Sequence, residues 1–276
     1  MEVRPPLWVT LAKYISLLAA MFVVLFPIYS IFVGAFKTKE EYYQSGLGLP
    51  QDWFNFDNFS RVYEVGKLGL GFKNILIILV ITLIGNIILG TMVAYALGRF
   101  DFKLKKLIMG MYLMATFIPM VTTQVATFTV VKELGLYNNL GAPILIYLGA
   151  DVLQITIYLQ FIRNIPKDLD ESAMVEGASL FKIYRSIIFP LLTPATATLL
   201  ILKTISVYND FYTPYLYMPS QDLRVVSTAL YAFIGPNAAQ FNVISAGILI
   251  IFIPTVIVFL FMQRYIFSGV TSGAVK

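Results

Sequence analysis

The chain has 276 residues, of which 58% are hydrophobic and 13% are charged, and its formal net charge is +5. Soluble domains carry about 25% charged residues, so this composition excludes an ordinary soluble protein and indicates an all-α integral membrane protein with several spans. The chain contains neither cysteine nor histidine, which excludes thiol chemistry and removes the usual general base and metal ligand.

The first half of the sequence contains two long apolar segments. Residues 14–36 form the first predicted span, which is too long for a signal-peptide core and has no small-residue cleavage site, so we expect it to remain in the protein. A polar excursion at 37–73 precedes the second span at 74–97. Four aromatic residues of this excursion either pack as a cap at the membrane interface or contact a ligand: Trp53, Phe54, Phe56 and Phe59.

The second half predicts four further spans, which makes six in all. They cover residues 107–130, 143–162, 192–208 and 243–265. Six spans place both termini on one side of the membrane, and most lysine and arginine residues lie in the short segments of that side. The positive-inside rule therefore predicts that both termini and the loop between the fourth and fifth spans are cytoplasmic. The positive charge reflects this topology, and we expect no nucleic-acid partner.

The loop between the fourth and fifth spans, residues 166–190, is a polar island with the pattern of two short helices. Gly177 ends the first helix, since glycine readily takes the left-handed conformation of a helix exit, and Ser179 caps the second. Acidic residues open the first helix behind Pro166, where the helix dipole favours negative charge: Asp168, Asp170 and Glu171. The predicted apolar face of the second helix consists of Leu180, Tyr184, Ile187 and Leu191.

The first of these helices has the character of a docking element. Leu169 and Ala173 lie one turn apart, so they predict a compact knob with small residues at its tip. An ordinary structured loop remains the alternative, although a loop that only connects two spans has no need of such a shape.

The island also carries a motif. An acidic residue is followed by two small residues, by a glycine six positions after the acidic residue, and by a closing Ile-x-Phe-Pro. This pattern resembles the cytoplasmic coupling loop of ATP-binding-cassette importer permeases, with Ser172 in place of an alanine and Phe189 in place of a leucine. The resemblance implies that the residues that couple to the ATPases are Glu171, Ser172, Ala173, Gly177, Ala178, Ile187 and Pro190.

Three further stretches are similar to the smaller permease subunit of maltose-type carbohydrate importers. They are SVYNDFYTPYLYM at 206–218, QRYIFSGVTSGAVK at 263–276, and IPMVTTQVATFTVVKELGLYNN at 118–139. The resemblance implies a single permease domain over residues 1–276, with its core at about 73–267, that passes a carbohydrate across the cytoplasmic membrane of a bacterium or archaeon. It also implies that the tail at 268–276 reaches toward the ATPases.

The same resemblance implies the partners. They are a second, larger permease subunit, two ATPase subunits, an external solute-binding protein, the carbohydrate itself and membrane lipid. This chain has no G-x-x-x-x-G-K-[ST] motif, so we expect ATP and Mg²⁺ on the partner ATPases and no cofactor, metal or catalytic residue here. The chain is predicted to be a transport subunit and not an enzyme.

Polar residues inside predicted spans are candidates for the substrate pathway, because a mixture of carboxylate, amide and aromatic groups suits a sugar. The candidates are Tyr147, Asp151, Gln154 and Tyr158, which fall on one helical stripe of the fourth span, with Gln124 in the third and Asn209 and Asp210 at the outer end of the fifth. The alternatives for Asp151 are an interhelical hydrogen bond or a position near the outer membrane interface. For Asn209 and Asp210 the alternative is a structural role at a cap or turn, or docking of the binding protein. Asn86 is expected to form an interhelical hydrogen bond.

Two other classes of protein compete with the importer. An ion-gradient-driven secondary transporter is disfavoured because only Asp151 is an acidic residue near the middle of a predicted span. A membrane enzyme would need a catalytic constellation, and the sequence shows none. A requirement for ATP, and not for an ion gradient, distinguishes the importer from the secondary transporter.

Overall fold

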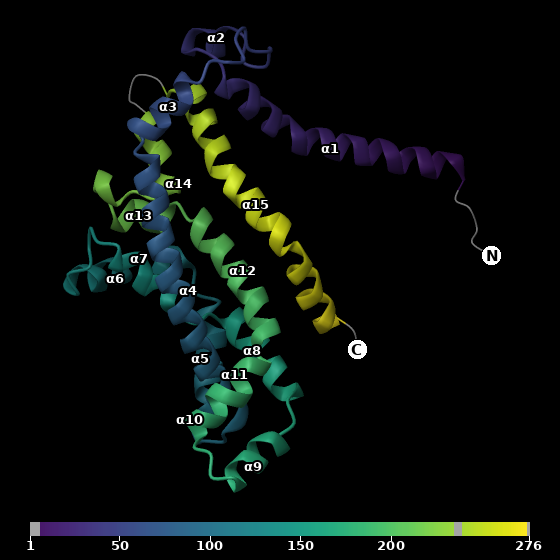
Figure 1. Cartoon of the computed structure of the whole chain (residues 1–276), viewed down its shortest axis with the longest axis vertical. Helices are drawn as coiled ribbons and strands as arrows, with labels where there is room; N and C mark the ends of the chain where they lie inside the picture. The colour runs from purple at the N-terminus through teal and green to yellow at the C-terminus, as the bar shows by residue number, and fades with distance from the viewer. Residues whose placement is uncertain (1–5, 235–238, 275–276) are drawn as a thin grey trace. The chain divides into compact units, whose positions relative to one another are not determined.

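Figure 1 shows the computed structural model of the chain, which describes residues 6–234 and 239–274. Side chains are described as far as Phe261, apart from that of Met120. All named elements in these residues are helices, with one isolated antiparallel bridge between Ile234 and Ala239. The all-α class predicted from composition is therefore confirmed. The predicted role of the tail at 268–276 falls outside the described side chains.

The chain divides into two compact units, residues 1–68 with 229–257 and residues 69–228 with 258–276. The first unit contains α1 (Leu7–Ala35), α2 (Lys39–Gln44), α3 (Asp57–Glu64) and the first part of α15 (Phe241–Ala274).

The second unit begins with the long helix α4 (Leu68–Arg99). It continues with α5 (Lys105–Ala115), α6 (Met120–Glu133), α7 (Gly141–Leu148), α8 (Val152–Asn164), α9 (Asp168–Val175), α10 (Leu180–Ile183), α11 (Phe189–Leu191), α12 (Thr193–Asn209), α13 (Tyr212–Tyr217) and α14 (Val226–Ala229). Its main core joins buried side chains from α4, α8, α9, α10 and α12.

Among the described residues, three helices are long and apolar enough to cross a membrane: α1, α4 and the part Phe241–Phe261 of α15. Two helix pairs pass the same test together but are bent, α7 with α8 by 43° and Leu180–Leu191 with α12 by 73°. The structure therefore supports three candidate spans, or five if each bent pair is one span. The bends follow from the sequence at the breaks, where Gly149 separates α7 from α8 and Pro194 lies in the first turn of α12.

The predicted third span is divided in the structure. Helix α5 ends at Ala115 and α6 begins at Met120, with Pro119 in an extended conformation directly before it. Proline has no backbone N–H to donate and its ring clashes with the preceding turn, so a helix readily begins after it and does not readily run through it. The sequence placed this proline in mid-span; the structure places it at a helix start.

Asn58 on α3 is the polar centre of the first unit. Its side-chain amide donates to the carbonyls of Ala35 and Lys37, each at 2.8 Å, and its oxygen accepts from Asn242 at 2.8 Å. Lys37 itself is fully buried, and its ammonium donates to the carbonyls of Ser45 and Gly46. The bonds from Asn58 satisfy free carbonyl groups at the end of α1, which would otherwise be buried without a donor, and those from Lys37 satisfy carbonyl groups just after α2.

The aromatic residues of the first excursion pack on one another as a cap. The ring of Phe36 lies 5.3–5.9 Å from those of Trp53, Phe56 and Phe59. Phe54 is 83% exposed. Of the two interpretations of this cluster, the structure supports packing.

Asn58→Ala is expected to lower the melting temperature, by an amount that corresponds to a loss of about 1–3 kcal/mol, because the carbonyl of Ala35 loses its buried donor. Thermal unfolding of the purified chain in detergent measures this. Ser60→Ala, which alters an exposed position of the same helix, is the control and should leave the melting temperature unchanged. Equal melting temperatures for the two variants would contradict the assignment.

Candidate functional site

Residues 166–190, called the coupling segment below, form two short helices joined by a tight turn, as the sequence predicts. Gly177 has φ +80°, its N–H donates to the carbonyl of Met174, and the N–H of Ala178 donates to that of Ala173. This pair of bonds is the Schellman arrangement, in which a left-handed residue ends a helix. Ser179 accepts a hydrogen bond from the N–H of Lys182 and so begins α10.

The second helix of the coupling segment differs from its predicted form. Between α10 and α11, residues Tyr184–Ile188 form a π-helical turn, which widens the helix by one residue. The buried side chains are consequently those of Ile183, Tyr184, Ile188 and Leu192. Of the predicted apolar face only Tyr184 is buried; Leu180 and Leu191 are half exposed. The prediction assumed 3.6 residues per turn throughout, and the wider turn shifts the register.

The predicted knob is also wrong in one respect. Ala173 is 9% exposed and belongs to the core of the unit, beside Ile183 and Tyr184, whereas Leu169 is 43% exposed. Glu171 and Ser172 are exposed as well. The surface of the coupling segment nevertheless carries a group of exposed apolar side chains, called the apolar face below: Leu169, Met174, Val175, Leu180 and Phe181.

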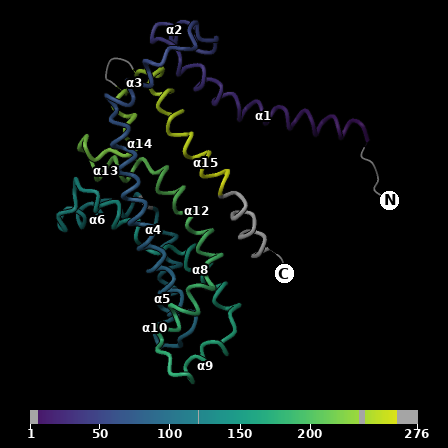
Figure 2. Tube along the Cα trace, in the orientation of Figure 1, coloured from purple at the N-terminus to yellow at the C-terminus, as the bar shows by residue number. Residues whose placement is uncertain are grey.

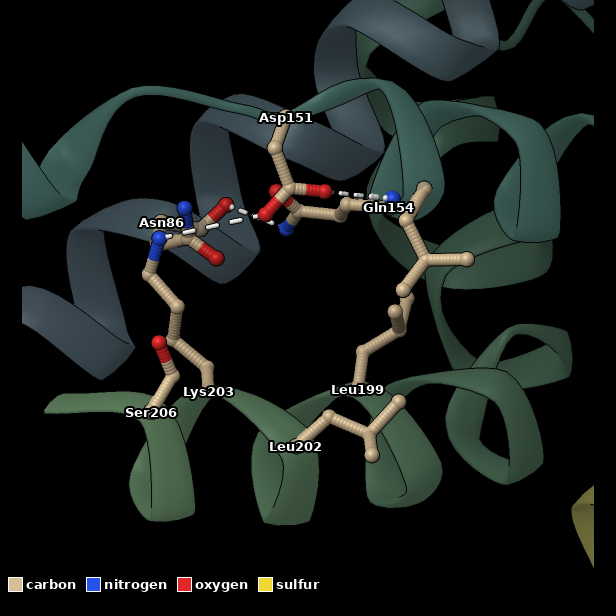
Figure 3. Close-up of a pocket in the computed structure, with 8 residues that line it drawn as sticks. Asn86, Asp151, Gln154, Leu199, Leu202, Lys203 and Ser206 are labelled. Carbon is tan, nitrogen blue, oxygen red and sulfur yellow. Dashed lines mark hydrogen bonds and ion pairs between the residues drawn. The ribbon is translucent and has the colours of Figure 1, made fainter. Parts of the chain in front are cut away.

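A cavity of about 170 Å³ lies between α4, the start of α8 and α12 (Figure 3). Its polar lining includes Asp151, Lys203 and Ser206, and its apolar lining comes from Leu153, Leu199 and Leu202. Asp151 accepts a hydrogen bond from the N–H of Gln154 at 2.8 Å and so caps α8. Its other oxygen lies 4.0 Å from the ammonium of Lys203. The carboxylate is 56% exposed, so the cavity opens to the surface at Asp151.

Gln154 and Asn86 form the floor of this cavity. The Gln154 side chain is almost fully buried and donates to the backbone carbonyl of Asn86 at 3.0 Å, while its oxygen is buried with no hydrogen-bond partner among the described residues. Asn86 donates to the carbonyl of Gly149 at 2.9 Å and to those of Tyr147 and Leu148. The interhelical role predicted for Asn86 is confirmed.

The predicted stripe of four residues on one helix is wrong, because the chain breaks between α7 and α8. Asp151 and Gln154 line the cavity. Tyr158 is fully buried below it, where its hydroxyl donates to Thr196 at 3.1 Å. Tyr147 belongs to α7, and its hydroxyl donates to Asp210 at 2.8 Å.

The remaining pathway candidates lie on other elements. Asp210 also accepts from the N–H and the hydroxyl of Thr213, so it caps the start of α13. Asn209 is the exposed last residue of α12. Gln124 on α6 is hydrogen-bonded to the hydroxyl of Tyr212.

Sequence reasoning missed Lys203 and Ser206. Both lie inside the predicted fifth span, at a spacing of three residues that places them on one side of a helix. A lysine within a span was itself a signal, because charged groups at membrane depth are rare and usually functional.

The family of binding-protein-dependent transport system inner membrane components matches this chain over residues 86–272. The melibiose/raffinose/stachyose import permease MelC of Bacillus subtilis (strain 168) is 34% identical over 268 residues, which cover 96% of each chain. The probable starch degradation products transport permease AmyC of Thermoanaerobacterium thermosulfurigenes is 33% identical over 91% of each chain.

The fold also matches solved structures. A crystal structure of a bacterial ABC transporter involved in the import of the acidic polysaccharide alginate contains a chain that superposes with a TM-score of 0.82 at 20% identity, over 96% of this chain and 99% of that one. A second structure, of a bacterial alginate ABC transporter in complex with an alginate pentasaccharide-bound periplasmic protein, gives a TM-score of 0.65 at 18% identity, over 93% of each chain. At sequence identities of 20% and 18%, the similarity to these two chains shows a shared fold and nothing more specific.

Proposed function

The chain belongs to the family of binding-protein-dependent transport system inner membrane components and is a permease subunit of an ATP-binding-cassette importer for carbohydrate in the cytoplasmic membrane; we propose that its coupling segment links sugar passage to ATP hydrolysis in partner subunits. It is a membrane component and not an enzyme. The ion-gradient alternative finds no support in the relatives, which are named as ABC or sugar import permeases.

Two ATPase subunits, which bind ATP and Mg²⁺, are the proposed partners of the coupling segment, and a second permease subunit completes the pore. A solute-binding protein delivers the sugar from outside, as the complex with a periplasmic protein supports by analogy of fold. The relatives named for melibiose, raffinose, stachyose and starch degradation products favour an oligosaccharide as the cargo.

The proposed topology keeps six crossings with both termini in the cytoplasm. Two of them are the broken pairs α5 with α6 and α7 with α8, since breaks in a membrane helix are tolerated where neighbouring helices satisfy the freed backbone groups. The distribution of lysine and arginine supports the orientation. Both compact units belong to one permease domain in this proposal.

The observation that carries the proposal is the shape of the coupling segment. A rigid turn at Gly177 orders two helices between α8 and α12 (Figure 2). The apolar face is exposed although the rest of the loop is largely polar, and in this proposal it is the surface that docks on the ATPases. Glu171 and Ser172 lie on the exposed part of α9, where they border this contact.

The proposed sugar pathway uses the cavity. The exposed carboxylate of Asp151 is an acceptor for sugar hydroxyl groups, and the leucine side chains suit the apolar face of a sugar ring. Tyr147, Tyr158, Gln124 and Asp210 hold the flanking helices in place through their own hydrogen bonds. Asn209 is exposed at the end of α12 and remains a candidate contact for the sugar or for the binding protein.

The first experiment tests the function itself. The chain, reconstituted in proteoliposomes with its partner permease, ATPases and binding protein, should import at least one of melibiose, raffinose, stachyose and maltotriose when ATP is supplied. A proton or sodium gradient without ATP should drive no uptake. Uptake of these sugars that needs only the ion gradient would overturn the assignment.

Gly177→Val is expected to release the ATPases, because a branched side chain at positive φ carries roughly 1–2 kcal/mol of strain and distorts the turn. Space is not the cause, since a Cβ at Gly177 meets no atom within 4 Å. Gly177→Asn is the matched control, since asparagine takes the left-handed conformation readily. Co-purification of the ATPases with tagged permease measures the effect. Full retention by the valine variant would remove the docking role.

Asp151→Asn is expected to raise the KM for sugar several-fold with little change in melting temperature. Asparagine still caps α8, whereas the charge beside Lys203 is lost. Asp210→Ala is the contrast, because it removes the cap of α13 and the acceptor of Tyr147, and should lower stability by about 1 kcal/mol. Normal uptake kinetics and normal stability of Asp151→Asn would remove this residue from the pathway.

A further inference from the structure

The final part of α4 carries three side chains spaced four residues apart, Thr91, Tyr95 and Arg99, which share one side of the helix. Each meets the coupling segment. The hydroxyls of Thr91 and Tyr184 lie 2.7 Å apart, the rings of Tyr95 and Tyr184 are 5.6 Å apart, and Nε of Arg99 lies 2.7 Å from Oδ2 of Asp170. One stripe of α4 therefore contacts both helices of the coupling segment.

The ion pair between Arg99 and Asp170 is buried. The two side chains are 6% and 9% exposed, and Nη2 of Arg99 also donates to the carbonyl of Ile165 at the end of α8, at 3.0 Å. A buried ion pair adds little net stability, because desolvation offsets its attraction, but separating its members leaves a charge unpaired in the interior. Such a pair is suited to hold a single arrangement of the elements that carry it.

The side chains around the ion pair are also closely packed. Gly98, directly before Arg99, faces Ile162 of α8 so closely that a Cβ there would lie 2.7 Å from its Cγ2. Ala173, Ile183 and Tyr184 of the coupling segment share one buried core with Ala94 and Tyr95 of α4. The coupling segment and the ends of α4 and α8 thus form one packed body.

We propose that Arg99 and Asp170 are positioning residues that make the coupling segment move together with the ends of α4 and α8. Without them, the first helix of the coupling segment would have no ion pair to α4, and α4 would be held to the segment only by the contacts of Tyr184 and by apolar packing. The pair adds a direct path to α4, whose Asn86 lines the cavity. This inference rests on the proposed function, since it assumes that the ATPases act on the coupling segment.

The first test measures coupling. In the reconstituted transporter, Asp170→Asn should lower the number of sugar molecules imported per ATP hydrolysed by about tenfold, with the ATPases still bound. The sugar is whichever of melibiose, raffinose, stachyose and maltotriose the wild type imports fastest. The charge exchange Arg99→Asp with Asp170→Arg should recover the ratio to within about threefold of wild type, because it restores the pair.

The matched control is Asp101→Asn. It removes the carboxylate of an exposed pair in the adjoining loop, with Lys105 at 2.9 Å, where the carboxylate is 93% exposed, and it should leave the ratio unchanged. A merely structural pair would lower melting temperature and yield while the ratio stays at the wild-type value, and that result overturns the proposal. Failure of the charge exchange to recover the ratio overturns it as well.

The second test can be carried out even if variants that change only Arg99 or only Asp170 fail to assemble. The chain has no cysteine, and a Cβ at position 98 would lie 3.4 Å from that of Ile162, near the separation of about 3.5–4.5 Å in disulfides. Oxidising Gly98→Cys with Ile162→Cys should link α4 to α8 and leave transport within about twofold of the reduced protein. Reversible loss of transport on oxidation would show that the two helices separate, and would overturn the proposal.

The two proposals fail separately. If the wild-type protein imports sugar with ATP but the variants of Arg99 and Asp170, or the cross-linked protein, give the contradicting results described above, only the positioning role is wrong. If wild-type protein imports no sugar with ATP, the proposed function fails before any variant is compared.

Discussion

Buried backbone groups at the ends of broken helices are the constraint on which the structure depends. Where such groups are shielded from water, each free carbonyl or N–H needs a partner from the chain. Asparagine and aspartate side chains supply many of those partners. Asn58 serves the end of α1, Asn86 the end of α7, and Asp151 and Asp210 the starts of α8 and α13. Asn74 donates to the carbonyls of Asp222 and Arg224, each at 2.9 Å.

This constraint explains why the cavity lies where the fourth predicted span is broken. The break frees the carbonyls of α7 and the N–H groups of α8, and the polar side chains that satisfy them gather at one place. Asp151 therefore has two tasks, since one oxygen caps α8 and the other faces Lys203. Polar residues of a span cannot be divided into structural and functional groups by type alone.

The coupling segment combines a rigid interior with an apolar face. The Schellman turn, the buried pair with α4 and the shared core restrict its movement, while the apolar face remains exposed. The π-helical turn begins at Tyr184, whose hydroxyl lies 2.7 Å from that of Thr91, while Leu180, one turn earlier, is half exposed. Rigidity inside and exposure outside are both required of an element that passes movement from one subunit to another.

The sequence by itself determined the helical membrane class, three to five of the six predicted spans, the two helices of the coupling segment, and the caps at Gly177 and Ser179. Each of these depends on local chemistry: apolar length, left-handed conformation, or a hydroxyl beside a free N–H. Only the tertiary structure decided that Ala173 is buried, that Tyr147 and Asp151 lie on different helices, and that Arg99 pairs with Asp170. Ala173 is buried by packing against the second helix of the coupling segment and α4, and Arg99 and Asp170 lie 71 positions apart in the sequence, so no local pattern encodes either feature. Gly149 is a local signal for the break between α7 and α8, but the bend that results is set by the tertiary structure.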